Sequence, residues 1–186
     1  MENHSKEFLN YDEFKNASEA FRVYQLTHNI IRKDYQILLE ITERAKDNNI
    51  EFDALYRASL KSLFTIIEAD IFGLNNLDKY PNYSDQHRFE DKFKNTFSNI
   101  CKVWKKQEIK EKYFDAKYSD LKNIRRKRDE LVHPKNMLHI HGASINDFNK
   151  LKQVFTDYDN FINSLMDGFF IEVQIDIKDI LGIKNG

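Results

Sequence analysis

The segment DALYRASLKSLFTIIEADIFGL, residues 53–74, decides the fold of this chain. Its apolar residues recur every three or four positions, which places them on one face of a helix. The face consists of Leu60, Leu63, Phe64, Ile67, Ile71 and Phe72. So broad a face needs cover from several neighbours, so the segment is predicted to be the most buried helix of an all-α protein. The sequence Gly73-Leu74-Asn75-Asn76 predicts its end.

Further helices are predicted on both sides of this segment, giving a bundle of about five helices with mostly antiparallel neighbours. They cover approximately residues 18–46, 85–110, 113–132 and 145–170. Ser144 to Asp147 resembles a capping box with Asp in place of Glu, which favours a helix start there. A short C-terminal tail follows, and residues 173–177 alternate in polarity like a strand. A lone strand either pairs with a copy of itself or packs against the bundle.

Composition favours long helices and one soluble domain. Only 5 Gly and 2 Pro occur in 186 residues, too few for the many turns of a sheet protein. We expect a single domain, residues 1–186, with 1–50 as an N-terminal helical extension and 53–170 as the bundle core. Cys101 is the only cysteine, so an intrachain disulfide is excluded and a buried structural thiol is expected.

The same features predict a cytoplasmic protein. A chain without a disulfide suits a reducing compartment. Residues 1–7 lack the apolar run of a signal peptide, and no apolar run elsewhere is long enough for a membrane span. The chain is therefore expected to be soluble, with no membrane partner.

Positive charge gathers in one part of the chain. The net charge is −1, yet residues 102–135 carry twelve basic and six acidic residues, a local charge of +6. A basic zone on an acidic protein is typical of a polyanion contact, and it is also typical of a merely solvated helix face. The zone contains the side chains predicted to bind substrate, namely Arg125, Lys127 and Lys135.

Arg128 and His133 carry the most informative chemistry. Arg128 shares a helical stripe with Leu121, Ile124 and Leu131, so its guanidinium leaves the helix beside the apolar face and needs an acid or a ligand. Pro134 ends the helix and releases His133 from helical geometry, so the imidazole can turn towards Arg128. The negative end of the helix dipole favours a cationic histidine there, which suits proton transfer near neutral pH.

The string Arg128-Asp129-Glu130-Leu131-Val132-His133, followed by Pro134, resembles the motif of the HEPN superfamily (higher eukaryotes and prokaryotes nucleotide-binding domain). That motif is an Arg, a polar residue that is most often Asn, and a His four to six positions after the Arg at a helix end. Residues 62–69 more loosely resemble the family's early core helix. The resemblance covers about residues 53–170.

The resemblance implies a helical bundle that dimerises, and for many members a metal-independent endoribonuclease used as a toxin or an antiviral effector. Its site would be shared across the homodimer. His133 would be the general acid or base, Arg128 would hold the scissile phosphate, and Asp129 would complete the catalytic set. RNA would be the substrate, with an antitoxin or regulatory protein as a further partner.

Other interpretations stay open. Arg128 can instead be paired inside the bundle with Glu68, which is predicted to be partly buried, and Glu68 can also orient the arginine in a site. His133 can be only a helix cap. Asp129 departs from the usual Asn, and it can repel phosphate, orient His133 or neutralise Arg128. The alternative function is a non-catalytic helical module for binding or dimerisation.

No cofactor is expected. His139 and His141 lie on one side of an extended segment near His133, but no carboxylate or Cys completes the spacing of a metal site. We therefore interpret this segment as a polar loop. The chain has no Gly-rich phosphate loop, so hydrolysis of nucleoside triphosphates has no support.

Overall fold

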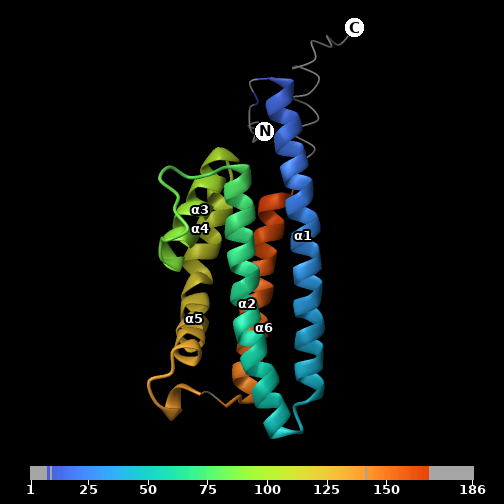
Figure 1. The fold of residues 1–186 in the computed structure, drawn as a ribbon, viewed down its shortest axis with the longest axis vertical. Helices are drawn as coiled ribbons and strands as arrows, with labels where there is room; N and C mark the ends of the chain where they lie inside the picture. The colour runs from blue at the N-terminus through green and yellow to red at the C-terminus, as the bar shows by residue number, and fades with distance from the viewer. Residues whose placement is uncertain (1–7, 9, 141, 168–186) are drawn as a thin grey trace. The chain divides into compact units, whose positions relative to one another are not determined.

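A computed structural model describes residue 8, residues 10–140 and residues 142–167 of the chain. In this part there is no strand, and the all-α prediction is confirmed (Figure 1). The helices are α1 (Tyr11–Arg44), α2 (Asn49–Leu77), α3 (Phe89–Val103), α4 (Gln107–Ala116), α5 (Tyr118–Val132), the 3-10 turn η1 (Met137–His139) and α6 (Ile145–Met166). The tail 173–177, with its strand-like pattern, lies outside the described residues.

The described residues divide into two compact units, and α1, α2, α4 and α6 each contribute one part to each unit. The first unit holds residues 8, 10–27, 70–111 and 161–167; the second holds residues 28–69, 112–140 and 142–160. None of the helices in the described part is long and apolar enough to cross a membrane.

The second unit is a helical bundle in which α1, α2, α5 and α6 run alternately in opposite directions (Figure 1). Aromatic pairs hold its helices together. Tyr35 of α1 meets Phe155 of α6 with ring centroids 4.8 Å apart, and Phe52 of α2 meets Phe148 of α6 at 5.6 Å. Each pair is edge-to-face, a geometry that adds roughly 0.5–1.5 kcal/mol to the area buried. The predicted burial of α2 is confirmed, since Leu60, Leu63 and Ile67 are fully enclosed.

The first unit packs α3 against parts of α1, α2 and α6. Phe97 of α3 contacts Phe161 of α6 at 5.0 Å, and Phe21 of α1 contacts Trp104 at 6.4 Å. Cys101 is fully buried among these rings, as predicted for a structural thiol. Burial raises the pKa of this thiol to about 12, despite the opposing effect of Lys110 and Lys106.

The predicted helix 85–110 is wrong, because the chain breaks between α3 and α4. Lys105 has a φ of 54°, in the left-handed region. The Lys106 N–H bonds the Cys101 carbonyl at 2.7 Å, which is the bond that closes a Schellman motif. Glycine usually takes this place. Here the indole of Trp104 donates to Asp78 Oδ2 at 2.7 Å, and this bond holds the chain where the helix stops.

The predicted end of the second helix near Leu74, with residues 73–76 as its stop, comes too early, since α2 continues to Leu77. Gly73 lies inside the helix against Tyr24 of α1, where a Cβ atom would come within 2.3 Å of the ring. The glycine therefore serves close helix packing and not termination. Asn75, also interpreted as part of the stop, is buried and donates to Thr96 Oγ1 at 2.7 Å.

The predicted capping box at the start of α6 is confirmed. Ser144 Oγ accepts a hydrogen bond from the Asp147 N–H at 3.1 Å, and Asp147 Oδ2 accepts one from the Ser144 N–H at 3.3 Å. The box fixes where the chain turns from the loop after α5 into the last helix.

Candidate active site at the end of helix α5

Helix α5 carries the motif and presents one buried face to the second unit. Tyr118, Leu121, Ile124 and Leu131 are buried, whereas Arg128 is 28% exposed at the edge of that face. Its guanidinium carbon lies 5.9 Å from the centre of the Phe64 ring of α2. The prediction that the arginine leaves the helix beside the apolar stripe is confirmed.

Two carboxylates hold Arg128 in this position. Its Nη1 donates to Asp129 Oδ1 at 3.1 Å, and its Nη2 lies 3.9 Å from Glu68 Oε1 on α2. The Nε atom is buried and has no hydrogen-bond partner in the described structure. The head group thus combines an aromatic contact, one close acid and one distant acid, so both predicted interpretations of Arg128 keep support.

Asp129 also contacts Arg125, whose Nε lies 3.3 Å from Asp129 Oδ2. One carboxylate therefore lies between two arginines of the same helix, at positions four and one residues away. Of the roles predicted for Asp129, the neutralisation of Arg128 is the one that has a contact in the structure. The Asp129 side chain makes no hydrogen bond with the His133 ring.

The Glu68 side chain is 50% exposed, so this acid is partly buried, as predicted, but it is not enclosed in the core. The prediction relied on Phe72 as a core residue, but Phe72 is itself mostly exposed, so this stripe of α2 reaches the surface. The buried acid of α2 is Asp70, which accepts a hydrogen bond from the Tyr24 hydroxyl at 3.0 Å. The predicted partner of Glu68 is present, since its nearest cation is Arg128.

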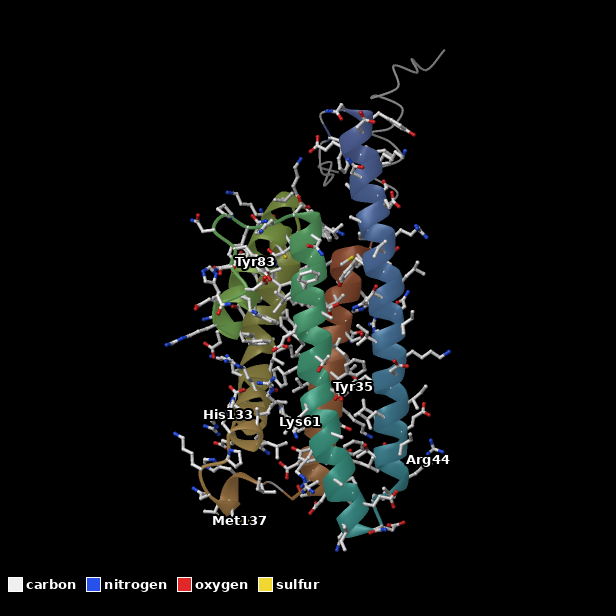
Figure 2. All side chains as sticks on the ribbon, viewed as in Figure 1. Tyr35, Arg44, Lys61, Tyr83, His133 and Met137 are labelled. Atoms are coloured by element: carbon white, nitrogen blue, oxygen red, sulfur yellow. The ribbon has the colours of Figure 1, made fainter. Side chains whose placement is uncertain are left out.

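His133 lies where α5 ends and the turn with Met137 begins (Figure 2). Its φ and ψ of −124° and 63° are not helical, and its N–H bonds the Asp129 carbonyl at 3.0 Å. The release from helical geometry before Pro134 is as predicted. The side chain is exposed, and the ring has no hydrogen bond or ion pair with any described residue. The imidazole is therefore accessible to a ligand, and it does not contact Arg128.

The three predicted substrate-binding cations differ in their surroundings. Lys127 is bonded to Asp147 of α6, and this bond together with Ser144 lowers the pKa of Asp147 against the opposing effect of burial. Arg125 is paired with Asp129. Lys135 is exposed, with no acidic partner in the described structure. Of the three, Lys135 is therefore the one with an open ammonium group.

Arg126 was missing from the predicted substrate-binding set, although it has the accessibility that this role needs. It is exposed, and no described residue forms an ion pair with it. It lies on α5 seven positions, about two helical turns, before the residue that ends the helix, His133. Nothing in the sequence distinguishes it from the neighbouring cations that are paired with acids.

The loop after His133 is held by side-chain bonds. Asn136 Oδ1 accepts from the Leu138 N–H at 2.9 Å, and His139 Nδ1 accepts from the Lys135 N–H at 3.2 Å. Farther along, the Ala143 N–H donates to Asp53 Oδ1 of α2 at 2.6 Å. These bonds fix the turn that follows the exposed histidine.

The described residues contain no cluster of three or more His, Cys, Asp or Glu side chains that could hold a metal ion. His141, one of the two loop histidines, lies outside the described residues. The Nδ1 atom of His139 accepts a hydrogen bond from the Lys135 N–H within the loop.

Comparison with protein-family models, curated proteins and solved structures finds no match for this chain. Helix α5 and the turn after it carry an exposed imidazole, an arginine at the edge of the core and two exposed cations.

Proposed function

We propose that this chain is a metal-independent endoribonuclease with His133 and Arg128 as its catalytic residues. The observation that carries the proposal is the His133 imidazole, which is exposed at a helix end and has no partner in the described structure. A group that transfers protons must be accessible to the substrate. His133 also follows Arg128 by five residues, and a guanidinium can bind a phosphate. The motif resemblance to the HEPN superfamily supports the same assignment.

The reaction would be an attack by a ribose 2′-hydroxyl on the adjacent phosphodiester. His133 takes the hydroxyl proton, the 2′-oxygen bonds to phosphorus, and the 5′-oxygen leaves and takes up a proton. The products are a 2′,3′-cyclic phosphate and a free 5′-hydroxyl, so the atoms balance without water or metal. Arg128 would stabilise the charge that develops on the phosphate oxygens.

A homodimer would complete this site. One histidine cannot remove a proton from the nucleophile and supply one to the leaving group at the same moment, and a second copy provides the second histidine. Arg126 and Lys135 would bind neighbouring phosphates, because each is exposed and lies within seven positions of His133. A nuclease of this kind acts as a toxin or antiviral effector, restrained by an antitoxin or regulatory protein.

The test is cleavage of a single-stranded RNA in excess EDTA by the wild-type chain and by His133→Ala. We expect the variant to lose roughly 10²–10⁴ in rate, as for loss of a general acid–base group. The wild-type product should end in a cyclic phosphate. Met137→Ala is the control, since it removes another exposed side chain of the same turn that the mechanism does not use. Equal rates for wild type and His133→Ala, or cleavage that EDTA abolishes, would refute the proposal.

A non-catalytic binding module is the second candidate, and one contact favours it. Asp129 neutralises Arg128 directly, which weakens the attraction of the arginine for a phosphate. Under this function RNA or another anion binds without being cut. Binding by both wild type and His133→Ala, with no cleavage by either, would identify the chain as this module.

A further inference from the structure

Helix α1 exposes a row of isoleucines on the surface of the second unit. Ile30 is 63% exposed, Ile37 is 44% exposed and Ile41 is 40% exposed. Successive members are seven and four positions apart, so they share one face of the helix. The opposite face holds the buried Tyr35 and Leu39, so the isoleucine row lies on the outward side of the helix. Scattered exposed apolar residues are ordinary, but an aligned row marks an interaction surface.

A cavity of about 210 Å³ opens beside this row, between α1 and α2. Its lining includes Ile31, Asp34 and Leu38 of α1 and Ser62, Thr65 and Ile66 of α2. A cavity of roughly 150 Å³ accepts a molecule as large as benzene, so an aliphatic side chain fits here. The isoleucine row and the cavity lie on adjoining surfaces of the second unit.

Two opposite charges flank the row. At about 100° per residue, Lys33 falls on one side of the line through Ile30 and Ile37, and Asp34 falls on the other. Both side chains are exposed, and neither has an ion-pair partner among the residues that the structure describes. The surface therefore carries an apolar centre with a cation on one edge and an anion on the other.

The charges select one arrangement of two copies. In a parallel pair the two-fold axis runs along the helices, so opposite flanks meet and Lys33 of each copy faces Asp34 of the other. In an antiparallel pair like flanks meet, so Lys33 would face Lys33 and Asp34 would face Asp34.

We propose that this face of α1 binds a second copy of the chain in parallel, with Ile30 and Ile37 along the axis and Lys33 paired with Asp34 on both sides. This association uses α1 and its cavity with α2, whereas the proposed catalytic residues are on α5. It is therefore additional to any pairing that shares the nuclease site, and it stands whether or not the chain cleaves RNA.

The experiment measures the mass of the full chain by sedimentation over a range of micromolar concentrations. We expect Ile37→Glu to raise the dissociation constant of the self-association at least about tenfold, since it buries an unpaired charge in the contact. Ile50→Glu is the control, because Ile50 is an isoleucine of the same unit, 85% exposed and off the row.

The charge pair gives a sharper test. Lys33→Asp and Asp34→Lys should each weaken the association, and the double variant should restore it, because the exchanged charges are again complementary. Ile30→Cys or Ile37→Cys should each form a disulfide-linked dimer on mild oxidation, while the native Cys101 is buried and does not interfere. In an antiparallel pair residue 30 would face residue 37, so a disulfide-linked dimer would form only when the Ile30→Cys and Ile37→Cys variants are mixed.

Three outcomes would overturn the proposal. One is an association that Ile37→Glu leaves unchanged. Another is a double charge variant that stays as weak as the single variants. The third is a monomeric wild type in which Ile37→Glu lowers the unfolding temperature while Ile50→Glu does not, because the row would then be covered from within the same chain. RNA cleavage is measured separately, so failure of the nuclease proposal leaves these results unaffected.

Discussion

Asp129 Oδ1 lies 3.1 Å from Arg128 Nη1, so the motif arginine carries its counter-ion on the very next residue. An Asn at this position would keep the hydrogen-bond acceptor and remove the charge. We expect Asp129→Asn to raise RNA affinity, and the cleavage rate at low substrate, by roughly two- to fivefold, since exposed charge pairs contribute roughly 0.2–1 kcal/mol. The gain should shrink with added salt.

Asp120→Asn controls for the change in net charge, because Asp120 is on the same helix and bonds Lys150 of α6, away from the motif. Activity that falls in Asp129→Asn would show that the carboxylate orients His133, a role for which the structure has no contact.

Native Cys101 should resist alkylation. Burial raises the pKa of its thiol to about 12, so thiolate is nearly absent at pH 8, and the sulfur is also inaccessible. Mass spectrometry after treatment with iodoacetamide should find no adduct on the folded chain and one adduct on the chain unfolded in guanidinium. Rapid complete labelling of the folded protein would mean that the first unit opens readily around this residue.

Gly73→Ala should destabilise the protein although alanine is the better helix former. The new Cβ would come within 2.3 Å of the Tyr24 ring, which its bond to Asp70 holds in place. Overpacking costs roughly 1–3 kcal/mol and the helix propensity returns about 1 kcal/mol, so we expect a net loss of about 1 kcal/mol in the free energy of unfolding. In a Tyr24→Leu background the same change should become neutral or stabilising. Persistence of the loss there would place the strain elsewhere.

Ser144→Ala should lower the free energy of unfolding by about 1 kcal/mol, the usual value for a helix N-cap. Chemical denaturation measures it. The variant removes the bond that the Asp147 N–H donates to Ser144 Oγ and the bond that Ser144 Oγ donates to Asp147 Oδ2. Thr156→Ala is a matched control, because its hydroxyl bonds only the Lys152 carbonyl in the exposed middle of the same helix.

The contribution of Asp147 should depend on pH in a defined direction. Its bonds to Lys127 and Ser144 hold its pKa below the ordinary value of 3.8. Stabilisation by a carboxylate with a lowered pKa is complete above the unfolded value and is lost as pH falls through the folded value. The difference in unfolding free energy between wild type and Asp147→Asn should therefore be constant from pH 7 to about pH 5 and shrink below pH 4. A difference that grows on acidification would contradict the lowered pKa.

Local sequence patterns predicted the parts of this fold that depend on local chemistry. The stripe Leu121, Ile124, Arg128 and Leu131 defined the inward side of α5, because helical spacing alone determines which residues share a face. Ser144 and Asp147 predicted the start of α6 because both capping bonds join residues only three positions apart.

What the sequence did not predict depends on contacts between distant residues. Lys105 takes a left-handed conformation because Trp104 is tied to Asp78, 26 positions earlier, and nothing near Lys105 signals it. Gly73 was interpreted as a helix end because the sequence does not show that it packs against Tyr24, 49 positions earlier. The sequence did not indicate that Asp70 is the enclosed acid of α2, because only the neighbouring helices decide which side of α2 is covered.

The same limit applies to the candidate site. The motif placed Arg128 at the core edge and His133 beyond the helix, but it could not show that Asp129 and Arg125 would satisfy each other. Nor could it show that Lys127 would be engaged by Asp147 on another helix. Only the structure therefore distinguishes the exposed cations Arg126 and Lys135 from the cations that are paired with acids.

The bond from the Ala143 amide to Asp53 joins residues 90 positions apart. Closing so long a loop costs entropy that local turns do not incur, so this anchor forms only once α2 and α6 have docked. During synthesis residue 53 emerges long before residue 143. The turn that flanks His133 therefore acquires its final shape only after residue 143 and the helix that follows it have left the ribosome.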